Sequence, residues 1–218
     1  MTGYPVLLDL KGRHCVVVGG GKVAARKVRD LLGAGASVTV VSQAFNAELL
    51  SLMKEGKLVL IEQVYQPGLV QTLFTDTLPL LLFAATNNPA INQQIVSEAQ
   101  QLGILVNRAD DADEGDFHNM AVARRGSLTI AVSSGGTSPV LAAYLRDQAQ
   151  LLLTDALVIL AGWMESSREA LQQTEPDQAQ RRIIWHRLMD SRVLDLLHEG
   201  DLQSARSLYD KIMSGETP

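Results

Sequence analysis

The chain has 218 residues, of which 46% are hydrophobic and 20% charged, and its formal net charge is −5. This composition is typical of a globular protein with its own core, and the acidic balance argues against a nucleic-acid partner. The longest apolar run, residues 78–85, is too short to span a membrane, and the first residues lack an export signal. Cys15 is the only cysteine, so an internal disulfide is impossible. We therefore expect a cytoplasmic protein with a buried, unreactive thiol.

Strands and helices alternate over the first 110 residues. Apolar runs predict strands at 14–19, 37–41, 58–61, 80–84 and 104–106, and periodic apolar residues predict helices at 23–32, 46–54 and 90–102. In the first of these helices we expect Lys27 to lie outside a buried face of Ala24, Val28, Leu31 and Leu32. The alternation predicts an α/β fold, a Rossmann-like parallel sheet with right-handed crossovers.

The pattern changes after residue 110. Residues 110–116 hold five carboxylates in seven positions, a composition typical of a solvated linker. Extended runs at 120–124 and 127–133 flank Arg125-Gly126 and predict a hairpin, and from Pro139 onward the chain reads as helices. We therefore expect a Rossmann-like domain over 1–113, a small α+β region over 114–150 and a helical C-terminal domain over 151–218.

A glycine turn between the first strand and helix predicts a dinucleotide site. Gly19, Gly21 and Ala24 occupy the small-residue positions of a G-x-G-x-x-G/A fingerprint, which brings a pyrophosphate to backbone N–H groups and a helix N-terminus. The second strand ends in Ser42-Gln43 without the usual carboxylate for the ribose, so these two side chains are the candidates there. No arginine follows either, so we favour NAD, with NADP left open.

Two further strand ends lie on the same predicted rim of the sheet. Thr86 and Asn87 follow the fourth strand, where they serve either the nicotinamide half of the cofactor or the cap of the next helix. Asp110 follows the fifth strand and is the carboxylate of the acidic run nearest the sheet. A carboxylate beside the nicotinamide can act as general base when a hydride leaves the neighbouring carbon, so Asp110 is the catalytic candidate.

The remaining polar motifs each have a structural alternative. The turn at residues 133–138 offers an anion site or simply the capped start of a helix. His118 is more often a structural residue than a ligand, and because no other histidine stands at a ligand spacing from it, we expect no preformed metal site. The basic, aromatic run at 181–187 reads first as a solvated helix and second as a contact for an acidic substrate.

Four motifs in order carry a resemblance to one family: residues 18–24, residues 85–88 with Asn92, residues 107–110 and residues 131–142. Together they resemble precorrin-2 dehydrogenase, found alone or as the N-terminal module of siroheme synthases, over essentially the whole chain. The resemblance implies oxidation of precorrin-2 to sirohydrochlorin by NAD and, in bifunctional members, insertion of Fe2+ as a second substrate to give siroheme. Because the sequence stops at Pro218, we expect no methyltransferase module.

The resemblance also implies roles for particular residues. Asp110 falls on the family's proton-accepting carboxylate, and Lys22, Val23, Gln43 and Ala44 fall on its NAD-contacting positions. Ser134 falls in its substrate-facing turn, where phosphorylation would weaken binding of the polycarboxylate substrate. The family further implies a homodimer in which residues 114–150 are exchanged between subunits.

Precorrin-2 carries many carboxylates, so the substrate side needs hydrogen-bond donors. The candidates are Arg124, Arg125, His118 and the Ser134-Gly135-Gly136 turn. The acidic side chains of Asp111, Asp113, Glu114 and Asp116 would repel this substrate, so we expect them to face solvent. Two alternatives stay open: a non-catalytic, NAD-responsive Rossmann sensor, and a dehydrogenase without chelatase activity.

Overall fold

The computed structural model describes residues 3–75 and 77–216, and it divides the chain into two compact units, Met1–Asn119 and Met120–Pro218. The first unit is built on a five-stranded sheet of order β3-β2-β1-β4-β5 in which all neighbours are parallel. This confirms the predicted Rossmann-like α/β fold. The strands are β1 (His14–Val18), β2 (Ser37–Ser42), β3 (Val59–Glu62), β4 (Leu81–Ala84) and β5 (Leu105–Arg108).

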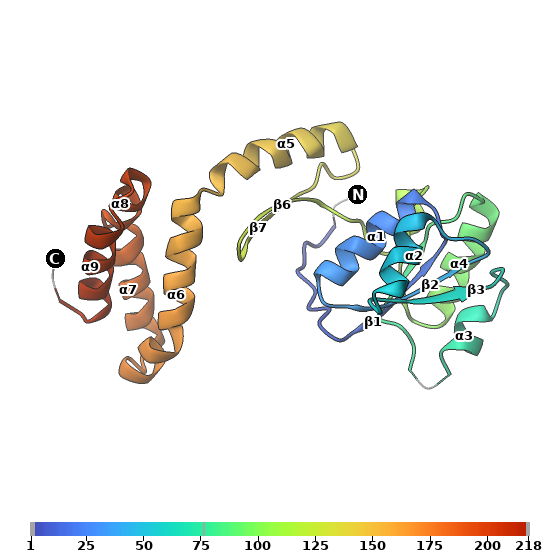
Figure 1. Cartoon of the computed structure of the whole chain (residues 1–218), viewed down its shortest axis with the longest axis horizontal. Coiled ribbons are helices and arrows are strands. Elements are labelled where there is room, and N and C mark those ends of the chain that lie inside the picture. The colour runs from blue at the N-terminus through green and yellow to red at the C-terminus, as the bar shows by residue number, and fades with distance from the viewer. Residues whose placement is uncertain (1–2, 76, 217–218) are drawn as a thin grey trace. The chain divides into compact units, whose positions relative to one another are not determined.

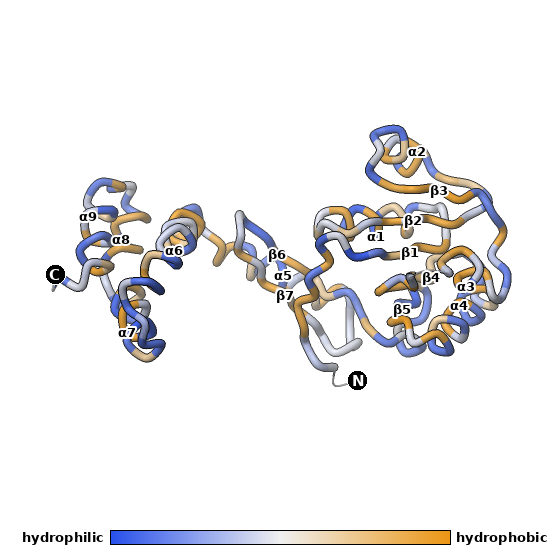
Figure 2. Tube along the Cα trace, turned by 90° about the horizontal axis from the view of Figure 1, so that it is seen from below, coloured by the Kyte–Doolittle hydropathy of each residue, from blue (hydrophilic) through white to orange (hydrophobic). Residues whose placement is uncertain are grey.

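Helices cover both faces of this sheet (Figure 1). They are α1 (Lys22–Gly33), α2 (Ala47–Lys54), α3 (Leu69–Leu73) and α4 (Pro89–Gln101). One core joins α1 and α2 to side chains such as Val17 and Phe83, and the other joins α3 and α4 to Val16 and Leu82. Figure 2 shows the strands as mainly hydrophobic stretches between the two helical layers. Each fully buried aliphatic side chain contributes about 1.5–3 kcal/mol to folding.

Helix α1 corrects one expectation. Ala24, Val28 and Leu31 are buried as predicted, but Lys27 is buried with them, at 7% exposure. Its position follows from the helical period, because residue 27 lies three positions after Ala24 and four before Leu31. The ammonium group donates to Asn119 Oδ1 at 2.5 Å and lies 5.5 Å from the centre of the Phe83 ring. Burial lowers the pKa of Lys27 to about 8.

The lone thiol behaves as predicted. Cys15 is fully buried in β1, and burial raises the pKa of its thiol to about 11. A thiol with so high a pKa is protonated at neutral pH, and the protonated form is a poor nucleophile.

The acidic run leaves the sheet after β5 and forms a short 3-10 turn, η1 (Ala112–Glu114). The side chains of Asp111, Asp113, Glu114 and Asp116 are all exposed, as predicted. Asp116 has a structural role nonetheless, because its Oδ2 accepts from the backbone N–H of Val106 while its own N–H donates to the Val106 carbonyl. These two bonds fasten the end of the run to the outer edge of β5.

The second unit begins with a hairpin and continues as helices, as predicted (Figure 1). Strands β6 (Ala121–Arg125) and β7 (Leu128–Val132) pair antiparallel around Gly126, whose φ of +57° suits the turn. The helices are α5 (Pro139–Leu152), α6 (Asp155–Thr174), α7 (Gln178–Met189), α8 (Val193–Glu199) and α9 (Leu202–Met213). A break between α7 and α8, at residues 190–192, was not expected from the sequence.

Helices α6 to α9 share a core around Leu160, Leu188 and Tyr209. Helix α5 contributes no buried residue to it and runs instead along the hairpin. Across residues 3–75 and 77–216 no single helix is long and apolar enough to cross a membrane; only the pair α5 and α6, bent by 70°, reaches that length and composition when the two are counted together.

Candidate functional site

The glycine turn lies where the sheet reverses its winding, between β1 and β4. The hydrogen-bond ladder runs past the strand ends here, because the Gly19 N–H donates to the Val41 carbonyl and the Ala85 N–H donates to the Val18 carbonyl. Gly19 has φ +130°, and a Cβ on it would stand 2.3 Å from the Ala85 carbonyl oxygen. Only glycine fits this crossing point, which is the position where parallel α/β sheets bind their ligands.

Sequence reasoning missed the middle glycine. A Cβ on Gly20 would lie 1.8 Å from the Ala44 carbonyl oxygen, and Gly20's own carbonyl accepts from Asn46 N–H. Gly20 therefore fastens the glycine turn to the loop after β2. Gly21 is different, since a Cβ there would meet nothing within 4 Å. Gly21 thus borders open space at the start of α1, whereas Gly20 is needed for the fold.

The start of α1 fits a bound pyrophosphate. Gly21 is its N-cap and supplies no side-chain acceptor for the first N–H groups, and no acidic residue lies in the first turn. Uncapped N–H groups at a helix N-terminus favour an anion. Lys22 and Val23 are exposed at this end, and Val23 is an apolar side chain left 42% exposed. The residues present thus suit a dinucleotide, with Lys22 adding a cation.

The end of β2 borders the same turn. Ser42 Oγ lies 2.8 Å from the position of a Cβ on Gly20, while Gln43 and Ala44 are exposed. The structure therefore places all three beside the fingerprint, as a ribose contact requires. Their contact with the cofactor stays a prediction.

Asn92 of α4, which sequence reasoning noticed only as part of a motif, joins two strand ends. Its side chain is fully buried. Its Oδ1 accepts from the Thr86 hydroxyl at 2.7 Å and from the Thr86 N–H at 3.1 Å, and its Nδ2 donates to Asp110 Oδ1 at 2.8 Å. Asn87 is exposed beside them, and Asn88 caps α4. Thr86 thus belongs to the framework that holds Asp110.

Asp110 is held from a second side by Arg108 of β5. The guanidinium Nε lies 3.1 Å from Asp110 Oδ1 and Nη2 lies 3.3 Å from Oδ2. Burial alone would raise the pKa of Asp110, but hydrogen bonds from Arg108 and Asn92 outweigh it and hold the pKa below its ordinary value. Asp110 is therefore an ionised carboxylate at neutral pH, partly open to solvent, on the same rim as the glycine turn.

The other predicted substrate residues divide between the two units. In the first unit, His118 is exposed two residues after Asp116. In the second, Arg124 is exposed, whereas Arg125 pairs with Asp155 and donates to the Leu153 carbonyl. Their part in substrate binding stays a prediction.

The turn before α5 is built from its own hydroxyls. Ser134 Oγ donates to the Ser138 carbonyl at 2.9 Å and accepts from the Ser138 N–H at 3.1 Å. Ser138 caps α5 and Pro139 is its first residue, as predicted. Gly135 and Gly136 have φ values of +63° and +85°, and both are exposed. The Ser134 hydroxyl is therefore half-buried and already engaged, and the exposed glycines are the part of the turn open to a ligand.

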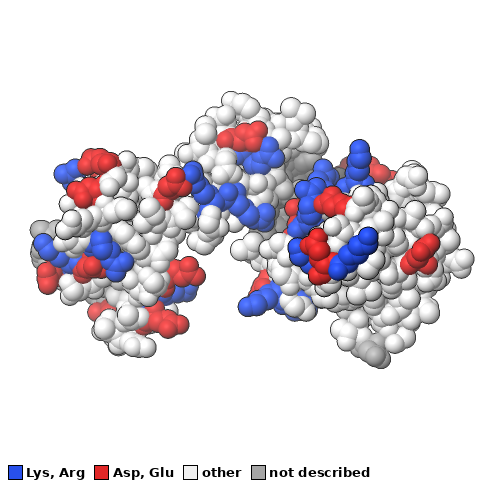
Figure 3. Space-filling view, in the orientation of Figure 1, with Lys and Arg blue, Asp and Glu red and all other residues white. Residues whose placement is uncertain are grey.

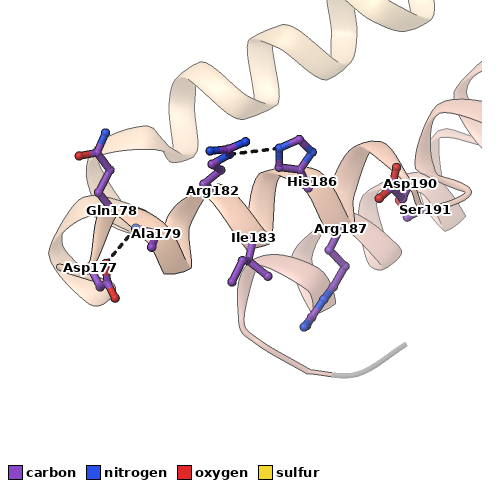
Figure 4. A pocket seen from close by; sticks show the side chains of 9 residues that line it. All are labelled: Asp177, Gln178, Ala179, Arg182, Ile183, His186, Arg187, Asp190 and Ser191. Atoms are coloured by element: carbon purple, nitrogen blue, oxygen red, sulfur yellow. Dashed lines mark hydrogen bonds between the residues drawn. The ribbon is translucent and has the colours of Figure 1, made fainter.

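A hollow of about 1090 Å³ lies along α7 and its flanking residues, Asp177 to Ser191 (Figure 4). Arg182 and His186 point toward one another there, and Ile183 is half exposed between basic side chains. The predicted contact with an acidic substrate at this helix stays a prediction. Among residues 3–75 and 77–216, no three His, Cys, Asp or Glu side chains are grouped so that they could hold a metal ion.

Comparison with known proteins yields several relatives. Siroheme synthase of Chromobacterium violaceum is 35% identical over 97% of this chain and 44% of that protein, and siroheme synthase of Methylobacillus flagellatus is 34% identical over 99% of this chain and 45% of its own. The chain spans less than half the length of these relatives. A solved structure, "SirC, precorrin-2 dehydrogenase", shares the fold with a TM-score of 0.78 and 24% identity, over 97% of this chain and all of that one.

Three family descriptions match consecutive parts of the chain. "Putative NAD(P)-binding" matches residues 6–121, "Sirohaem biosynthesis protein central" matches 125–148, and "Sirohaem synthase dimerisation region" matches 156–213. The first of them alone covers more than half of the chain, on the unit that carries the glycine turn and Asp110. The chain therefore belongs to this NAD(P)-binding family, with the two sirohaem synthase regions following in the same chain.

Proposed function

We propose that this protein oxidises precorrin-2 to sirohydrochlorin in siroheme biosynthesis, with NAD as the hydride acceptor. The observation that carries the proposal is the arrangement of one rim: a glycine turn with open space at Gly21, and an ionised Asp110 held by Asn92 and Arg108. The relatives named siroheme synthase and the family of the first unit support it. The reaction balances as the loss of one hydride to NAD and one proton from precorrin-2.

When bound, NAD is the oxidant of this reaction, because it accepts the hydride. The uncapped N–H groups of α1 and the Lys22 ammonium bind its pyrophosphate, and Ser42, Gln43 and Ala44 border the ribose. Asp110 accepts the proton that leaves the macrocycle, because it is ionised at neutral pH and partly exposed. Asn92 keeps Thr86 and Asp110 together at the strand ends, so the acceptor stays fixed on the rim that would hold the nicotinamide.

The finer parts of the proposal concern the substrate and the assembly. Arg124, His118 and the Gly135-Gly136 turn are proposed to bind the carboxylates of precorrin-2, in a cytoplasmic homodimer of this chain. Ferrochelation is proposed as a second activity, in which Asp110 accepts pyrrole protons as Fe2+ enters. The matched dimerisation region supports the dimer.

The test is spectroscopic. Purified protein is given precorrin-2 and NAD, and the absorption spectrum is followed; Fe2+ or Co2+ is added afterwards. The proposal expects sirohydrochlorin with equimolar NADH, and then metal insertion faster than the spontaneous rate. No sirohydrochlorin contradicts the dehydrogenase and favours the NAD-responsive sensor. Sirohydrochlorin with only spontaneous metal insertion selects a dehydrogenase without chelatase activity.

A further inference from the structure

Arg108 is the most tightly held charged side chain of the rim. It is only 9% exposed although it sits at the last position of an edge strand. Besides its two bonds to Asp110, its Nη1 donates to Gln93 Oε1 at 2.5 Å and its Nη2 donates to the Pro89 carbonyl at 3.4 Å. Arg108 therefore links Asp110 of the strand end to the first turn of α4.

These contacts leave Arg108 little capacity for a substrate. A guanidinium has five N–H groups. The Nε–H, both N–H groups of Nη2 and one of Nη1 have protein acceptors, which accounts for four of the five. A substrate-binding arginine would present its fork to the ligand, whereas this fork is turned to Asp110 and α4.

The two oxygens of Asp110 are unequally engaged. Oδ1 accepts from Asn92 Nδ2 at 2.8 Å and from Arg108 Nε at 3.1 Å, whereas Oδ2 accepts the longer Arg108 Nη2 bond of 3.3 Å. A carboxylate oxygen has two lone pairs. Oδ1 is thus fully used by the framework, and Oδ2 keeps acceptor capacity toward the partly exposed side.

We propose that Arg108 is a positioning residue, which acts with Asn92 to lock Asp110 in one orientation so that Oδ2 is the oxygen that accepts the substrate's proton. This deepens the proposed function and rests on it. The arginine fixes the geometry of the acceptor and keeps it ionised, and it does not itself contact the reacting atoms. Proton acceptors misplaced by about 1 Å lose up to about a hundredfold in rate.

The charges around the pair define what removal of Arg108 would do. On α4, Asn92 and Gln93 are neutral, and Thr86 is neutral on the loop after β4. The exposed carboxylates of Asp111 and Glu114 also act on Arg108. Without the arginine, burial acts on Asp110 with only the Asn92 side chain and the backbone N–H of Asp110 itself to oppose it. The pKa of Asp110 then rises, and its proton-accepting form is lost at a higher pH than in the unchanged protein.

The experiment compares two substitutions of one residue. Arg108→Gln removes the charge and the fork, whereas Arg108→Lys keeps the charge and loses the fork. The control is Arg29→Gln, which breaks an exposed ion pair with Glu48 between α1 and α2, where basic and acidic side chains lie side by side (Figure 3). The titration of Asp110 is read from its 13C carboxyl resonance, assigned with Asp110→Asn, and turnover is read as kcat and KM against pH.

The expected result separates charge from geometry. Arg108→Gln raises the pKa of Asp110 and moves the acidic limb of the kcat profile to higher pH, while Arg108→Lys leaves both near the original. Both variants lower kcat by about tenfold to a hundredfold and leave the KM for NAD within about twofold. Arg108→Gln that folds with unchanged Asp110 titration and unchanged kcat overturns the proposal.

Two features keep the test decisive. The carboxyl titration needs no substrate, so it tests the positioning role even if the protein fails to oxidise precorrin-2, and that failure would count only against the proposed function. If Arg108→Gln does not fold, Gln93→Ala removes the Nη1 anchor from an exposed helix position. It is expected to shift the titration and kcat in the same direction by less, and no change in either overturns the proposal.

Discussion

Helices α4 and α5 are of nearly equal length and are both partly apolar, yet they differ in how much of their surface is buried. Helix α4 buries five residues, of which Ile95, Val96 and Ala99 belong to the core beside the sheet. Helix α5 buries none, and it exposes Val140 by 79% and Leu151 by 73%. Helix α4 thus buries its apolar side chains within its own unit, whereas α5 leaves them exposed, as a helix covered by a second copy of the chain in the proposed homodimer would.

The sharpest contrast within the first unit is between two adjacent glycines. Gly20→Ala forces a Cβ to 1.8 Å from the Ala44 carbonyl and should cost at least about 4 kcal/mol in free energy of unfolding, or prevent folding. Gly21→Ala meets no atom of the protein, so it should fold normally and weaken NAD binding instead. Urea unfolding and calorimetric titration with NAD measure the two effects. Equal stability of the two variants would contradict the separate roles assigned to Gly20 and Gly21.

The comparison of α4 with α5 is tested by matched truncations. Ile95→Ala should lower the free energy of unfolding by about 2–5 kcal/mol, because Ile95 is fully buried. Val140→Ala should change the stability of the isolated chain by less than about 0.5 kcal/mol.

Leu151→Glu should shift a dimer toward monomer in sedimentation. A Leu151→Glu variant with the same dimer affinity as the unchanged chain would remove α5 from the interface.

Lys27 provides a pH-dependent effect, and its sign follows from burial. Its pKa is about 8 in the folded protein, against an ordinary value of 10.5, so between these values the unfolded chain binds more protons. Stability should therefore rise with pH through this window, by about 2–3 kcal/mol. Lys27→Met should abolish that rise relative to the unchanged protein, as read from urea unfolding at pH 7.5 and pH 10. An identical rise in both proteins would show that folding does not lower the pKa of Lys27.

The sheet was predictable because most of its strands are short apolar runs, β-branched in β1 and β2, and Asp110 because a strand end and a family motif coincide there. Helix α3 was not, since it is short, has Gly68 as its N-cap and depends on Glu98, which lies 28 residues beyond Val70 and accepts the Val70 N–H. The burial of Lys27 was not predictable from its charge, because its position in the helical period and its contact with Asn119 decide it. The roles of Gly20, Asn92 and Arg108 follow from contacts between segments that are separate in the sequence, so no local pattern reveals them.

The coupling of a dinucleotide site to a fixed proton acceptor on one rim is tested most directly by Asp110→Asn. NAD affinity and a single turnover of precorrin-2 are measured on the same preparations. NAD affinity should stay within about twofold, because the glycine turn is untouched, while the oxidation rate should fall about 10²–10⁴-fold. An unchanged oxidation rate in the folded variant would contradict the role of Asp110 as proton acceptor and, with it, the coupling of the dinucleotide site to Asp110.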